Sequence, residues 1–203
     1  MRGLILALGV LMATGANAAE RFPVLSDGQM SPEQKAVADA IRSGPRGSLG
    51  GPFNAWLRSP QLADRAQKVG EYIRFHSSIP ARLNEFAILI SARHWNAGYE
   101  WYAHYPLALK AGLKPQVAAD LARGRRPAGM AADETAVYDF CTELRRDRRV
   151  SDRTFAAAKA ALGEQGVVDL VAVSGYYDLV SMTLNVAEVA TPRDGALPLP
   201  DLK

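Results

Sequence analysis

The stretch Pro80–Gly112, PARLNEFAILISARHWNAGYEWYAHYPLALKAG, decides the fold of this chain. It predicts two helices joined at Trp95–Gly98. Pro80 stands where a helix start needs no N–H donor, and Gly112 is a suitable left-handed end for the second helix. From Phe86 to Ile90 the first helix is apolar on every side, and such a helix is buried all round. The segment therefore predicts a buried helical hairpin at the centre of the domain.

Two titratable side chains lie in this apolar hairpin. Glu85 begins the apolar run of the first helix, and His104 lies among apolar neighbours in the second. Burial disfavours the charged form of each group, whereas mutual proximity favours it, so the pair can hold pKa values near neutrality. A core histidine bonded to a backbone carbonyl is the structural alternative. The sequence indicates Glu85 and His104 as the candidate catalytic pair.

The order of these residues resembles the carboxymuconolactone decarboxylase family, which also contains the AhpD-type partners of thiol peroxidases. The resemblance rests on Glu85, on ARHW (92–95), on YEWYAH (99–104) and on Gly112 followed by leucine. It implies the all-α AhpD-like fold, assembly as a homotrimer or homohexamer, and a proton relay formed by Glu85 and His104.

The peroxidase branch of that family also carries a Cys-x-x-Cys pair shortly before its histidine. The corresponding positions here are Ala97 and Glu100. This departure removes the thiol chemistry of that branch and leaves the acid–base pair in place.

Four further side chains of the hairpin are candidates for substrate binding. Arg93 has the planar fork that suits a carboxylate, and a structural salt bridge is an equal alternative. Tyr99 could donate to a developing oxyanion, and Trp101 is expected in the core or the pocket wall. Glu100 precedes His104 by about one helical turn, so the two can interact, but a solvent-facing acid at a helix start explains it as well.

Simple hairpin geometry argues against direct contact within the candidate pair. If the chain reverses near residues 97–98, Glu85 lies about 18 Å along its helix from the turn and His104 about 9 Å. Arg93 and His94 would then be closer to His104 in height. Either the helices cross steeply, or a water, a substrate or another side chain bridges the pair.

No residue pattern indicates a metal or cofactor. His94, Glu100 and His104 could be drawn together, but no His or Cys pair has the spacing of a metal motif, and His76 is a weaker signal still. The sequence also lacks a P-loop and a dinucleotide-binding fingerprint. The only cysteine, Cys141, falls on the apolar face of a predicted helix, which favours a buried core residue over a reactive thiol.

Residues 1–18 have the three parts of a signal peptide, namely Arg2, an apolar run over residues 4–12 and an A-x-A site at 16–18. We expect cleavage there, a periplasmic or secreted location, and one domain over 19–203 with its core at about 51–189. No later stretch is expected to be long and apolar enough for a membrane helix. The formal charge is +3, and the arginines form clusters rather than one basic face, so nucleic acid is not an expected partner.

Capping signals predict a succession of helices along the rest of the chain. In chain order they cover residues 32–42, 60–75, 80–94, 99–111, 116–123, 132–146, 152–163 and 165–189. No segment alternates apolar and polar residues as a strand does. The predicted fold class is all-α, a helical bundle built around the buried hairpin.

Four details of these helices are specific expectations. The helix 60–75 should bury Leu62, Ala66, Val69 and Ile73. Pro106 removes a backbone donor and should bend or break its helix. Gly175 interrupts the last helix, and close helix packing is the favoured reason. The proline-containing tail 191–203 is expected to be extended and free to wrap a neighbouring subunit.

Three functions from different classes follow. The first is an exported, cofactor-free acid–base enzyme that decarboxylates or isomerises a small carboxylated lactone or a related ring acid, as the decarboxylase branch does. The second is an AhpD-like peroxidase or its reductant, which the missing cysteines disfavour. The third is a non-catalytic protein of the same fold that binds a small molecule.

Overall fold

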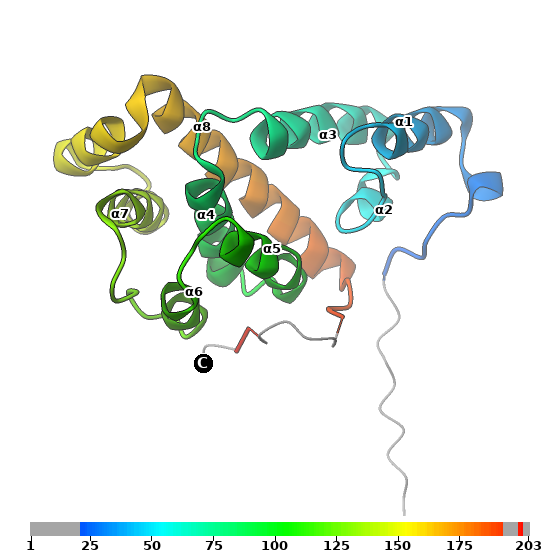
Figure 1. The fold of residues 1–203 in the computed structure, drawn as a ribbon. Helices are drawn as coiled ribbons and strands as arrows, with labels where there is room; N and C mark the ends of the chain where they lie inside the picture. The colour runs from blue at the N-terminus through cyan, green and yellow to red at the C-terminus, as the bar shows by residue number, and fades with distance from the viewer. Residues whose placement is uncertain (1–20, 193–198, 201–203) are drawn as a thin grey trace, which may run out of the picture.

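The computed structural model describes residues 21–192 and 199–200, and within them the protein is all-α (Figure 1). The expected signal peptide lies outside the described residues. The described elements, in chain order, are η1 (Asp27–Gln29), α1 (Pro32–Ser43), α2 (Phe53–Trp56), α3 (Pro60–Phe75), α4 (Ala81–His94), α5 (Gly98–Lys110), α6 (Pro115–Ala122), α7 (Ala132–Asp147) and α8 (Asp152–Ala187). These bounds confirm the predicted helices to within a few residues, and α2 is an addition.

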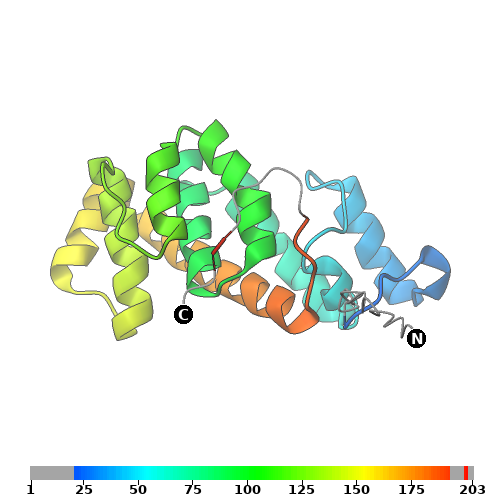
Figure 2. The same ribbon diagram turned by 90° about the horizontal axis from the view of Figure 1, so that it is seen from below.

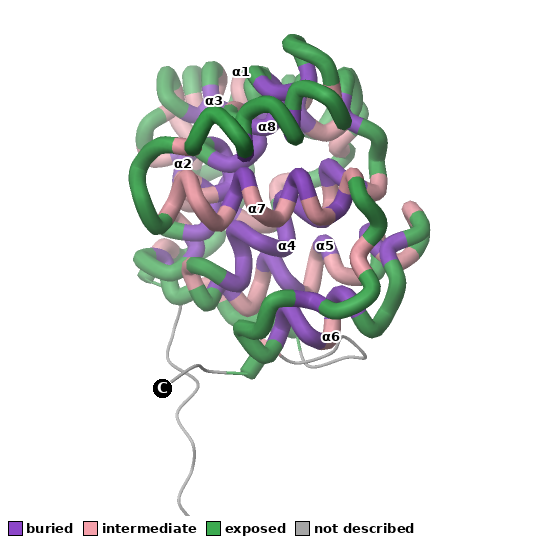
Figure 3. Tube along the Cα trace, turned by 90° about the vertical axis from the view of Figure 1, so that its left-hand side faces the viewer, coloured by how far each residue is buried: buried purple, intermediate pink, exposed green. Residues whose placement is uncertain are grey.

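The α4 helix lies at the centre of the fold and packs against α5, α6, α7 and α8. Figure 3 shows it buried along most of its length. Phe86, Ile88 and Leu89 have no exposed surface, as the all-round apolar pattern predicted. Burial of a side chain of this size contributes about 1.5–3 kcal/mol, so α4 supplies a large part of the core.

The α8 helix runs from one end of the molecule across most of it, behind α4 and α5 (Figures 1 and 2). Gly163 has φ 75° and ψ 178°, so a kink there separates two helical parts, close to the predicted boundary. The helix is long and apolar enough to cross a membrane by length and composition, with a mean hydropathy of 1.3, so the expectation of no later candidate was wrong. Of that apolar window, 56% is buried within this chain, as in the core helix of a bundle.

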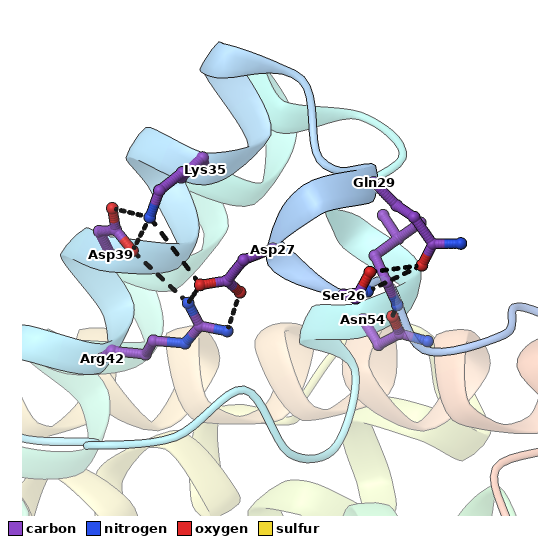
Figure 4. Close-up of polar contacts among 8 residues, drawn as sticks. Ser26, Asp27, Gln29, Lys35, Asp39, Arg42 and Asn54 are labelled. Atoms are coloured by element: carbon purple, nitrogen blue, oxygen red, sulfur yellow. Dashed lines mark hydrogen bonds and ion pairs between the residues drawn. The ribbon is translucent and has the colours of Figure 1, made fainter.

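Local capping fixes the start of α1. Ser31 Oγ accepts from the backbone N–H of Gln34, and Gln34 Oε1 accepts from the N–H of Ser31, so α1 begins with the predicted capping box. Arg42 of α1 pairs with Asp27 of η1 at 2.9 Å, which ties the N-terminal turn to α1 (Figure 4).

The predicted inward face of α3 was partly wrong. Ala66 and Ile73 are buried, but Leu62 and Val69 are exposed. The buried stripe also contains Ala63, Gln67 and Gly70. Small residues on this stripe let neighbouring groups lie close to the helix, and at Gly70 an added Cβ would come 2.1 Å from the hydroxyl oxygen of Tyr176 in α8. The α3 helix therefore turns its small residues toward α8, where close approach is needed, and leaves the larger apolar side chains Leu62 and Val69 exposed.

Neither of two expected helix breaks occurs in the described helices. The α5 helix continues through Pro106, which lies on its exposed side, where water can satisfy a carbonyl that lacks a helical donor. Gly175 does not interrupt α8, and nothing lies within 4 Å of the Cβ it lacks, so close packing is not its reason.

The described residues of the C-terminal tail lie on their own chain. The carbonyl of Pro200 accepts from Arg93 Nη1 at 2.6 Å, and Leu199 packs against the core. A Cβ at Gly98 would come 2.7 Å from Thr191 Oγ1, so the start of the tail lies against the first turn of α5. The described tail residues therefore contact their own chain, and wrapping of a neighbouring subunit stays a prediction.

The two glycines of α8 should respond oppositely to alanine. Gly163→Ala should lower the free energy of unfolding by about 1–3 kcal/mol, because φ and ψ at Gly163 lie in a region that only glycine adopts readily. Gly175→Ala should raise it by about 0.5–1 kcal/mol, since alanine suits an exposed helical position. Urea unfolding of both variants tests this, and the same sign for both would contradict the kink.

Candidate functional site

The centre of the candidate site is His104 of α5, which lies between two glutamates. His104 Nδ1 is 2.7 Å from Oε2 of Glu85 in α4. Because the two side chains touch directly, no water, substrate or third side chain bridges them. The α5 helix therefore crosses α4 so that His104 meets Glu85, although Glu85 lies farther along its helix from the turn than His104 does. The structural alternative assumed a core histidine bonded to a backbone carbonyl. His104 is buried as that alternative expected, but it bonds the carboxylate of Glu85 instead.

The second glutamate, Glu100, lies one turn before His104 on the same helix. Its Oε2 is 3.3 Å from His104 Nε2, and Glu100 is only 3% exposed, so the solvent-facing alternative is wrong. This contact lacks hydrogen-bond geometry, and Glu100 Oε2 has no hydrogen-bond partner among the described residues. The ring edge of His104 also meets Tyr177 of α8, with the ring centres 5.0 Å apart.

The electrostatics of the site favour a charged imidazole. Burial by itself disfavours the imidazolium, but Glu100 and Glu85 outweigh burial and raise the pKa of His104 to about 9. His104 therefore carries both ring protons at neutral pH, and its Nδ1–H donates to Glu85 while its Nε2 faces Glu100 as an ion pair. Burial raises the pKa of Tyr177 well above its ordinary value, so this hydroxyl stays protonated and remains a donor.

A cavity of about 160 Å³ opens beside this group. Glu100 and His104 form one wall, and Tyr99 adds to it from the same helix. The other walls come from Tyr176 and Tyr177 of α8, from Arg74 of α3, and from the loop between α1 and α2. The backbone of that loop approaches Tyr99 closely, since a Cβ at Gly50 would come 3.3 Å from the Tyr99 hydroxyl.

Two of the predicted substrate-binding residues lie away from this cavity. Arg93 points toward α6 and the tail, where Nη1 donates to the carbonyl of Ala122 at 2.8 Å. Trp101 is buried in the core and stacks on Tyr105 with ring centres 6.0 Å apart. The structure thus brings Glu85, Glu100, His104 and Tyr99 together, and it leaves Arg93 and Trp101 outside the cavity wall.

Several residues that line the cavity could not be predicted from the sequence. Arg46 lies in the glycine-rich loop before α2, and Arg74 lies near the end of α3. Tyr176 and Tyr177 follow Gly175, for which the sequence favoured close helix packing. The glycines of the 44–52 loop were the available signal for Arg46, because they permit close approach of the backbone.

The remaining candidates lie elsewhere. Cys141 is buried in the core with Sγ 3.6 Å from Ser174 Oγ, and burial raises the pKa of its thiol, as expected for a structural cysteine. His94 and His76 are exposed. Within residues 21–192 and 199–200 there is no group of three or more His, Cys, Asp or Glu side chains that could hold a metal ion.

The raised pKa of His104 predicts a pH-dependent stability. The ordinary histidine value is 6.5, so the stabilisation is fully present below pH 6.5 and is lost as pH rises through about 9. The loss should be roughly 3 kcal/mol. His104→Gln should lack this component, and Glu85→Gln should reduce it. Urea unfolding between pH 6 and 10 measures it, and parallel curves for the wild type and His104→Gln would contradict the assignment.

Comparisons with known proteins place the fold. No family model and no curated protein matches the sequence. Among solved structures, an uncharacterized peroxidase-related protein with an alkylhydroperoxidase AhpD core, from Ralstonia eutropha JMP134, has a TM-score of 0.71 at 15% identity over 86% of this chain and 93% of its own. An uncharacterized peroxidase-related protein from Silicibacter sp. TM1040 has a TM-score of 0.67 at 12% identity over 86% and 91%. This chain therefore has the all-α AhpD-like fold, as the sequence predicted.

Proposed function

We propose that this protein is an exported, cofactor-independent acid–base enzyme of the carboxymuconolactone decarboxylase type. Its substrate is a small carboxylated lactone or a related ring acid, which it decarboxylates or isomerises. The observation that carries the proposal is the imidazole of His104, held between Glu85 and Glu100 at the wall of a cavity. A buried, protonated donor beside a space for a small molecule is suited to proton transfer.

A decarboxylation needs little beyond such a donor. When the bond between the ring carbon and the carboxylate breaks, CO₂ leaves and the bonding electrons enter the ring as an extended enolate. His104 then gives its Nε2 proton to the ring carbon and becomes neutral. Glu85 holds the opposite ring nitrogen, so it keeps the imidazole oriented and favours its recharging from water. Tyr99 and Tyr177 are the candidate donors to the enolate oxygen.

Glu100 gives the site its second proton-transfer group. Its Oε2 is buried without a hydrogen-bond partner in the described part of the chain, and Glu100 lines the cavity. For an isomerisation, Glu100 can remove a proton from a ring carbon beside the carbonyl while His104 stabilises the enolate. The proton then returns at another carbon, so no net charge or electron is transferred.

The thiol peroxidase alternative remains disfavoured. The two similar structures are peroxidase-related proteins, but identities of 15% and 12% support the fold alone. The positions of the family's cysteine pair hold Ala97 and Glu100, and a single buried thiol cannot form the intramolecular disulfide of such a cycle.

Substitution of the relay should lower turnover without unfolding the protein. His104→Gln, Glu85→Gln and Glu100→Gln should each lower kcat by about 10²–10⁴-fold, which is the usual contribution of a general acid or base. Cys141→Ala should change it by less than about twofold. The assay is CO₂ release, or loss of ring absorbance, over a panel of carboxylated lactones and ring acids, with circular dichroism as the folding control.

The possible outcomes separate the three functions. Full activity of His104→Gln would contradict the relay. Hydroperoxide turnover that disappears in Cys141→Ala would favour the thiol alternative. Saturable binding with no turnover of any compound would favour the non-catalytic binding protein.

We also propose that the protein is a homo-oligomer, a trimer or a multiple of it. Support comes from an apolar stripe on α8 formed by Val168, Val171, Met182 and Val186, which are 40–68% exposed and recur on one face of the helix. Gly175, which is also exposed, lies on the same face. Val171→Glu with Met182→Glu should release monomers, which multi-angle light scattering measures. A monomeric wild type at micromolar concentration would contradict the proposal.

A further inference from the structure

Two buried polar atoms that make no hydrogen bond within the described chain belong to residues that line the same cavity. Arg46 Nη2 and Glu100 Oε2 are both buried, and neither has a hydrogen-bond partner in the described part of the chain. Buried donors and acceptors of this kind are rare in folded proteins, because each forfeits the hydrogen bond it would make with water. A donor and an acceptor on the walls of one small space indicate a ligand that supplies the complement of each.

Arg46 is held in place by packing rather than by a counter-ion. Its guanidinium lies over the ring of Phe53, with the central carbon 4.7 Å from the ring centre. Nη2 reaches the backbone of α3, where a Cβ at Gly70 would come within 3.0 Å of it. No carboxylate of the described chain forms an ion pair with Arg46, in contrast to Arg82, which pairs with Asp133 at 2.7 Å.

Arg74 adds a second positive charge to the same wall. Arg74 also forms no ion pair with a described residue, and burial of Arg46, together with the positive charge of Arg74, lowers the pKa of Arg46. Like charges held close to each other favour an anion between or beside them, which is a common use of arginine in recognition. Burial lowers the pKa of the Arg46 guanidinium, which is the expected sign for a cation without a partner.

The size of the cavity limits the ligand. Its volume of about 160 Å³ is close to that of an engineered cavity of about 150 Å³ that binds benzene, so one six-membered ring fills most of it. Glu100 and His104 stand on the wall formed by α5, and Arg46 stands in the loop before α2. A ring bound between them presents one group to Arg46 and another to Glu100.

We propose that the cavity binds a single-ring carboxylate that also carries a hydrogen-bond donor, with its carboxylate on Arg46 and its donor on Glu100 Oε2. Arg74 strengthens the attraction for the anion. This binding site rests on the proposed function in one respect only, namely that the ligand class is taken to be the substrate of the enzyme. If Arg46 paired with the carboxylate that leaves as CO₂, it would stabilise the ground state and slow the reaction. In a decarboxylation the carboxylate on Arg46 is therefore a second one, which the product retains.

The test measures binding and needs no turnover. The probes are 2-, 3- and 4-hydroxybenzoate, which combine both groups at three spacings, with benzoate lacking the donor and phenol lacking the carboxylate. Calorimetric titration of the full chain should give at least one hydroxybenzoate that binds about tenfold or more tightly than benzoate and than phenol.

Two substitutions should remove these preferences separately. Arg46→Gln should abolish the preference over phenol, with partial rescue in Arg46→Lys, and Glu100→Gln should abolish the preference over benzoate. Arg65→Gln is the matched control, because Arg65 lies on α3 but is exposed and outside the cavity. Thermal melting checks that each variant folds, and Arg74→Gln, which should weaken all the carboxylates, gives a second measurement if Arg46→Gln unfolds.

The outcomes are distinct from those of the kinetic test. Equal affinities for hydroxybenzoates, benzoate and phenol, or preferences that survive in Arg46→Gln and Glu100→Gln, would overturn the assignment even if the enzyme turns over a lactone. The expected ranking in an enzyme that turns over no compound would uphold the binding site and leave only the proposed reaction contradicted.

Discussion

The structure depends on one buried interaction, the imidazolium of His104 held between Glu85 and Glu100. Each of these groups would lose several kcal/mol of solvation in the interior if it lacked a partner. The contact therefore constrains how α5 crosses α4, because a slip of one helical turn, about 5.4 Å, would separate His104 from Glu85. Apolar packing around α4 supplies the stability of the hairpin, and the charged group selects one register for it. The same contact therefore determines both the register of the hairpin and the geometry of the candidate site.

The sequence predicted the parts of the fold that depend on local pattern. The all-round apolar run of α4 marked the buried hairpin, and residue type with spacing marked Glu85 and His104. Their contact could not be predicted, because it depends on how α5 crosses α4, and α4 also packs against α7 and α8, which lie far along the chain. Arg93 was chosen for its chemistry, but it lies eight residues after Glu85, about 12 Å along the helix, and reaches α6.

The cavity could not be predicted from local sequence either, because segments that are distant in the sequence form its walls. Its walls join the loop at Arg46, the end of α3 at Arg74, and α8 at Tyr176 and Tyr177, segments that lie far apart in the sequence. Gly70 shows what couples them, since only a residue without a side chain lets the Tyr176 hydroxyl and the Arg46 guanidinium approach α3 together. In sequence Gly70 is one small residue in an amphipathic helix, and nothing local distinguishes it from its neighbours.

Glu100 links the ligand to the acid strength of His104. Two carboxylates together keep the imidazole charged against burial. If a ligand donates a hydrogen bond to Glu100 Oε2, the negative charge of Glu100 is partly satisfied and supports the imidazolium less, so the pKa of His104 should fall toward neutrality. An acid whose pKa is near the working pH transfers its proton more readily. By linkage, protonation of His104 and ligand binding at Glu100 should then oppose each other by the same factor. A glutamate at this position thereby makes the acid strongest when the cavity is occupied, a control that a redox-active cysteine pair does not provide.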